Sequence, residues 1–88
     1  MEAYRVPFAV DRRRAPTYRL VNASLEPLRW VHVELDGPGL ASAPLTPRLD
    51  PGAAIEVEVR GRDLAAASTL IVRWLRASGD EYLWRVAF

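Results

Sequence analysis

The chain of 88 residues contains no cysteine, no lysine and no glutamine, and its one histidine is His32. The absence of cysteine excludes disulfides and every metal site that is built on thiolates. A lone histidine lacks the partner ligands that a metal site needs, so we predict neither a metal nor a cofactor. All twelve basic residues are arginine, which together with the abundant alanine indicates a GC-rich bacterial origin.

The chain also lacks a large excess of positive or negative charge, and it lacks long apolar runs. The formal net charge of +1 provides no general attraction to nucleic acid or to an anionic membrane surface. No apolar stretch approaches the roughly 20 residues of a membrane-spanning helix, and residues 1–14 do not have the pattern of a signal peptide. We therefore expect a cytoplasmic protein in which residues 1–88 form a single domain.

Alternation of apolar and polar residues, the periodicity of a β-strand, is the dominant pattern. It is cleanest where Ile55, Val57 and Val59 alternate with charged residues. The pattern predicts strands at 4–10, 17–22, 28–36, 55–60, 69–76 and 81–88, and one helical turn is expected at 63–67. Residues 40–48 contain Pro44 and Pro47, which exclude a central strand and leave a short edge strand or an extended crossover.

No amphipathic helix is present to cover a sheet, so the stable arrangement of these strands is two antiparallel sheets packed face to face. About seven short strands in under ~100 residues make the chain resemble, over its whole length, the immunoglobulin-like and fibronectin type III β-sandwiches. This resemblance implies that the third, sixth and seventh strands share one sheet. A small barrel of the OB or SH3 type is the alternative all-β fold.

The polar residues form no catalytic pattern. No serine occupies a nucleophile elbow and no glycine-rich phosphate loop occurs, while Glu56 and Glu58 are outward positions of one strand. We therefore expect a protein that is not an enzyme. The one basic run, Arg12, Arg13 and Arg14, is a candidate phosphate contact, but a solvated loop is favoured because the chain has no basic face.

Trp30 has the parity opposite to Val31 and Val33, so it faces outward if the valines face the core. The opposite register would bury the unpaired carboxylate of Glu34 at a cost of several kcal/mol, which favours the outward position. A bulge that turns Trp30 inward is the alternative.

The outer face of the predicted sheet formed by 28–36, 69–76 and 81–88 is the candidate partner interface. Its residues are Trp30, His32, Glu34, Ile71, Arg73, Leu75, Leu83 and Arg85.

Contiguous exposed apolar surface of this kind often marks a contact surface, whereas the outer face of the other predicted sheet is charged. The sequence therefore predicts a non-catalytic protein-interaction or assembly module that acts through this face or through an edge strand. Its partner is another protein or a second copy of the chain. The alternative function is nucleic-acid binding by Arg12, Arg13, Arg14 and Arg48 with exposed aromatic residues.

Overall fold

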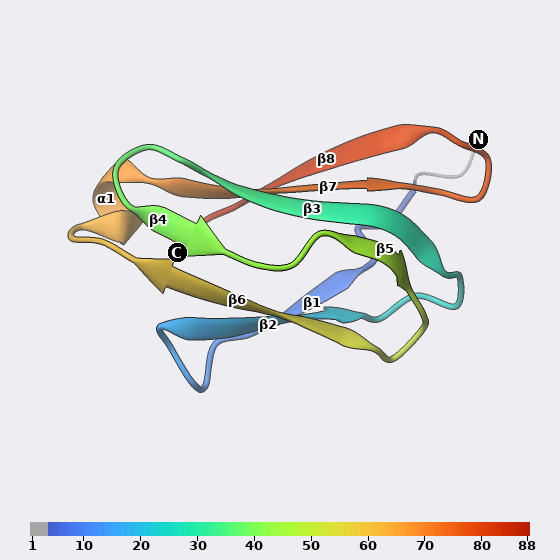
Figure 1. The fold of residues 1–88 in the computed structure, drawn as a ribbon, viewed down its shortest axis with the longest axis horizontal. Helices are drawn as coiled ribbons and strands as arrows, with labels where there is room; N and C mark the ends of the chain where they lie inside the picture. The colour runs from blue at the N-terminus through green and yellow to red at the C-terminus, as the bar shows by residue number, and fades with distance from the viewer. Residues whose placement is uncertain (1–3) are drawn as a thin grey trace.

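Two antiparallel sheets of four strands each lie face to face (Figure 1). The structure is a computed structural model, and it describes residues 4–88. Sheet A has the order β1-β2-β6-β4, and its strands are β1 (Phe8–Asp11), β2 (Thr17–Asn22), β6 (Ala54–Arg60) and β4 (Leu40–Ser42). Sheet B has the order β5-β3-β7-β8, and its strands are β5 (Thr46–Leu49), β3 (Leu28–Asp36), β7 (Thr69–Leu75) and β8 (Glu81–Val86). The predicted two-sheet antiparallel sandwich is confirmed, and the barrel is not the fold.

The predicted strand partners are also found, because β3, β7 and β8 are neighbours in sheet B. The doubtful segment 40–48 forms two short strands in different sheets, so the chain crosses from β4 in sheet A to β5 in sheet B and closes one side of the sandwich. The predicted helical turn is α1 (Leu64–Ala67). No helix within residues 4–88 is long and apolar enough to cross a membrane.

The core lies between the sheets and is built from the inward positions of the alternating strands. Trp74, Val57 and Leu20 are almost completely buried there, and Trp74 meets the ring of Phe8 edge-on with the ring centroids 5.1 Å apart. The first strand is shorter than predicted. It begins at Phe8, and of the two residues before it Val6 is exposed and Pro7 is buried.

Asn22 is a fully buried polar residue at the end of β2, and its carboxamide joins the two sheets. The Nδ2 group donates to the carbonyl oxygens of Glu26 (2.9 Å) and Leu49 (3.0 Å). The Oδ1 atom accepts from the backbone N–H (3.0 Å) and the hydroxyl (2.7 Å) of Ser24. Because Leu49 belongs to β5 in sheet B, one side chain of sheet A satisfies the backbone of the other sheet.

We expect Asn22→Ala to lower the free energy of unfolding by about 1–3 kcal/mol, because the buried Leu49 carbonyl loses its donor and the Ser24 backbone N–H loses its acceptor. Chemical denaturation followed by circular dichroism measures this change. Ser42→Ala, at an exposed position of β4, is the control and should stay within about 0.5 kcal/mol of the parent chain. A loss for Asn22→Ala no larger than that of the control would show that the carboxamide does not hold the sheets together.

Candidate functional site

The hairpin between β7 and β8 sets the orientation of the last strand. The Arg76 N–H donates to the Asp80 carbonyl (3.0 Å), and the Gly79 N–H donates to the Arg76 carbonyl (2.8 Å). Gly79 has a φ of 89°, the left-handed conformation that the closing residue of such a three-residue loop needs. The loop is therefore 77–79, and Arg76 and Asp80 form the first hydrogen-bonded pair of the hairpin.

Hydrogen-bonded and non-hydrogen-bonded pairs alternate along an antiparallel ladder. Counting from the Arg76–Asp80 pair with the observed register, Glu81, Leu83 and Arg85 are the non-hydrogen-bonded positions of β8. Their backbone N–H and C=O groups point away from β7. No hydrogen bond from residues 4–88 reaches these groups, so they form a free strand edge, which lies along the upper margin of Figure 1.

The three other sheet edges are less suited to pairing with another strand. β1 has four residues and follows Pro7, and β4 has three residues. β5 has four residues and contains Pro47, which cannot donate to a ladder. Short strands and prolines protect edges against additional pairing. β8, with six residues and no proline, is the longest edge strand of the described chain.

Charged side chains occupy the middle of the outer face of sheet B. Arg73 on β7 pairs with Glu34 on β3 (Nε–Oε1, 2.8 Å) and with Glu81 on β8 (Nη1–Oε1, 3.4 Å). Arg85 pairs with Asp36 (Nη1–Oδ2, 3.2 Å). These ion pairs are solvent-exposed, and such pairs contribute roughly 0.2–1 kcal/mol or less. His32 is half exposed, with Nε2 3.9 Å from Oε1 of Glu34.

The predicted apolar interface on this face is less extensive than expected. Ile71, predicted to be exposed, is 7% exposed, and the register places it between Glu34 and Arg85, whose long side chains flank it on this face. Leu83 remains 44% exposed at the edge strand, opposite Arg73. A charged row therefore separates Leu83 from Trp30, and the exposed apolar side chains do not form one continuous patch.

Trp30 lies on the outer face, as predicted, and is 52% exposed. The pairing of β3 with β7 shifts between Arg29 and His32, so a bulge is present, yet it does not turn the side chain inward. Trp30 has a φ of 49°, in the left-handed region that non-glycine residues rarely adopt. Beside it is a shallow hollow, and the other residues that line it are His32, Arg73, Trp74, Leu75 and Glu81.

The arginine run at the β1–β2 turn is largely engaged within the molecule. Arg12 donates from Nη2 to the Ala87 carbonyl (2.9 Å). Arg13 forms two side-chain hydrogen bonds with Asp11 and also donates its backbone N–H to that carboxylate, and these bonds hold the pKa of Asp11 well below its usual range. Arg48, which belongs to the nucleic-acid alternative, pairs with Asp50 (2.6 Å).

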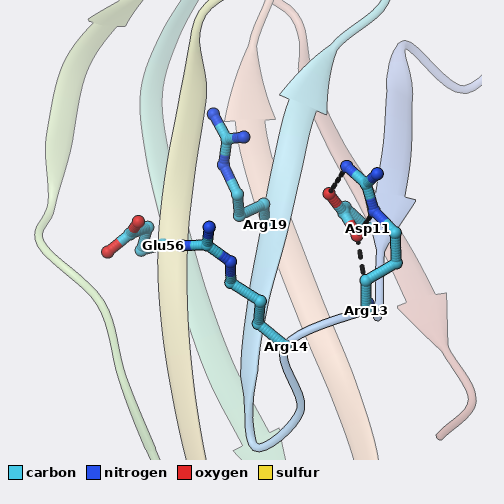
Figure 2. Close-up of a pocket in the computed structure, with 5 residues that line it drawn as sticks. All are labelled: Asp11, Arg13, Arg14, Arg19 and Glu56. Carbon is cyan, nitrogen blue, oxygen red and sulfur yellow. Dashed lines mark hydrogen bonds and ion pairs between the residues drawn. The ribbon is translucent and has the colours of Figure 1, made fainter.

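Arg14 and Arg19 form no ion pair within the described chain, and they share a hollow on the outer face of sheet A with Asp11, Arg13 and Glu56 (Figure 2). In Figure 2 the carboxylate of Glu56 points away from Arg19, although the two residues are opposite each other on β2 and β6. Trp30 lies in the other sheet. The structure therefore does not bring the arginine run and the exposed tryptophan onto one surface.

Comparison with known proteins adds no relative. The chain matches no protein-family model, no curated protein and no solved structure.

Glu81 is the residue of the free edge that sequence reasoning left out of the candidate interface. The missing information was which residues of β8 occupy the non-hydrogen-bonded positions opposite β7. Those residues direct their backbone N–H and C=O groups outward. The loop sequence contains a signal for it, because a glycine that closes a three-residue hairpin loop indicates the loop type found at 77–79. Glu81, Leu83 and Arg85 share one parity, so assigning the loop would have identified them together.

The left-handed conformation of Trp30 predicts that glycine at this position is more stabilising than alanine, the reverse of the usual order in a strand. Because an L-residue in this region costs roughly 1–2 kcal/mol and glycine does not, we expect Trp30→Gly to be more stable than Trp30→Ala by about 1 kcal/mol. Chemical denaturation followed by far-ultraviolet circular dichroism measures the difference.

The same pair of substitutions at His32, an exposed position of the same strand, is the control. There the alanine variant should be the more stable, since glycine destabilises an ordinary strand position. If alanine is also the more stable residue at position 30, the backbone of Trp30 is not left-handed.

Proposed function

We propose that this chain is a non-catalytic protein-interaction module that adds a partner's β-strand to the free edge of β8. The observation that supports this proposal best is the set of outward backbone groups of Glu81, Leu83 and Arg85, which have no partner within residues 4–88. Strand addition of this kind obtains affinity from main-chain hydrogen bonds and specificity from alternate side chains. Leu83, 44% exposed between two charged residues, provides the apolar side chain for such a contact.

The outer face of sheet B extends this contact surface. The hollow beside Trp30 is also lined by Arg73 on β7 and by Glu81 on β8. A long side chain of a strand bound at β8 could therefore lie along this hollow towards Trp30. Tryptophan and arginine are enriched among the residues that dominate binding energy at protein interfaces. The face therefore supplies side-chain contacts to a partner whose backbone is held at β8.

The alternative of nucleic-acid binding has less support. Arg12, Arg13 and Arg48 all bind oxygen atoms of this chain, and Arg14 belongs to the β1–β2 turn of sheet A, whereas Trp30 belongs to sheet B. Binding of single strands combines a basic groove with aromatic residues that stack on the bases. That combination requires both kinds of side chain on one surface.

Photo-crosslinking tests the proposed function. With benzoylphenylalanine in place of Leu83, we expect covalent adducts with another polypeptide in cells that produce the protein, whether that is a different protein or a second copy. The same group in place of Glu56, exposed on the outer face of sheet A, is the control and should give none of these adducts.

A second substitution separates strand pairing from accidental proximity. Arg85→Pro removes an outward N–H that β7 does not use, so the variant should keep the far-ultraviolet circular dichroism spectrum of the parent and lose the adducts formed at position 83. Adducts of equal yield from positions 83 and 56, or adducts that persist in the folded proline variant, would contradict the proposal.

A further inference from the structure

The free edge of β8 has defined limits at both ends. At its beginning, Asp80 uses its carbonyl to accept from Arg76 within the hairpin. Beyond its end, the next outward carbonyl belongs to Ala87, and Nη2 of Arg12 already donates to it (2.9 Å). Within the strand, the residues with both outward backbone groups unpaired are therefore Glu81, Leu83 and Arg85, and Leu83 is the centre of this short segment.

The segment is complementary to itself. When two such strands run antiparallel about a twofold axis at Leu83, Glu81 lies opposite the partner's Arg85, and Leu83 lies opposite the partner's Leu83. Each of these residues directs both backbone groups outward, so each opposite pair exchanges two hydrogen bonds. Opposite charges that face each other across an antiparallel pair are stabilising.

Other registers of the same two strands are less favourable. An antiparallel pairing shifted by two residues places a charged residue opposite Leu83, and a shift by four places Glu81 opposite the partner's Glu81 or Arg85 opposite the partner's Arg85. A parallel pairing in register also brings like charges together. Like charges directly opposite are destabilising, so a single register satisfies both the backbone and the charges.

We propose that two copies of this chain associate by antiparallel pairing of their β8 strands about Leu83. The four strands of sheet B in each copy then belong to one continuous sheet, and the long free edge of both copies is removed. On the inner side, Tyr82 lies opposite the partner's Trp84, and both aromatic side chains are only partly buried in the single chain. This inference rests on the proposed function and specifies its partner as a second copy.

The existing ion pairs of the charged residues do not prevent this association. Glu81 is 3.4 Å from Arg73 and Arg85 is 3.2 Å from Asp36, and both pairs are on the solvent-exposed face. Arg73 in addition has Glu34 at 2.8 Å, so it keeps a carboxylate partner when Glu81 turns to the partner's Arg85.

A charge-exchange experiment with sedimentation equilibrium tests the inference. The parent chain should be a dimer in equilibrium with monomer across roughly a hundredfold range of concentration. Glu81→Arg and Arg85→Glu should each raise the dissociation constant roughly tenfold or more, because both twofold-related pairs become like-charged. An equimolar mixture of the two single variants should form a heterodimer, since one chain then carries arginine at both positions and the other carries glutamate at both.

Matched controls carry the same charge changes on the other sheet. Glu56→Arg and Arg19→Glu lie opposite each other on the outer face of sheet A, and neither should change the dissociation constant. Recovery of association in the mixture also shows that the single variants are folded.

A parent chain that stays monomeric throughout the concentration range overturns the inference, and so does a dimer that the changes at 81 and 85 leave unaffected. In either case, adducts from position 83 to a different protein would leave the proposed function standing without the second copy. The absence of adducts as well would overturn both.

Discussion

Every strand at the border of a sheet leaves backbone groups without partners, and this constraint governs the arrangement of the whole sandwich. Two sheets have four borders, and three of them are protected by length or by proline in β1, β4 and β5. β8 has neither protection, because it pairs with β7 along all six of its residues and contains no proline. The candidate binding edge thus follows from the order of the elements along the chain.

The alternating pattern was sufficient to predict most strands, the two sheets and the inward side chains such as Ile55 and Val57, because parity alone decides which face of a strand is buried. The sheet change between β4 and β5 could not be predicted, since three or four residues beside prolines show no period. The left-handed backbone of Trp30 could not be predicted either, because the sequence carries no glycine there.

In the candidate site, too, parity predicts some features, whereas others depend on the register of neighbouring strands. Parity placed Leu83 and Arg85 on the outer face, but the burial of Ile71 depends on which long side chains lie beside it on β3 and β8. The charged row around Arg73 likewise arises from the register of three strands. The predicted apolar face is therefore divided in two, and the strongest feature that remains is the backbone of the edge strand.

Charges on an edge strand usually oppose pairing with other chains, and Glu81 and Arg85 perform this role in most registers. Because Glu81 and Arg85 are spaced symmetrically about Leu83, they stabilise one arrangement only. In this twofold antiparallel pairing, each of the two charges lies opposite a charge of the other sign. A pair of charges can thus destabilise the shifted and the parallel pairings of two β8 strands and still stabilise the twofold antiparallel pairing. Specificity is a difference between the free energies of competing complexes. The arginine at position 12 adds to this selection, because it donates to the carbonyl of Ala87, the next outward acceptor, and a partner strand shifted in that direction would compete with it.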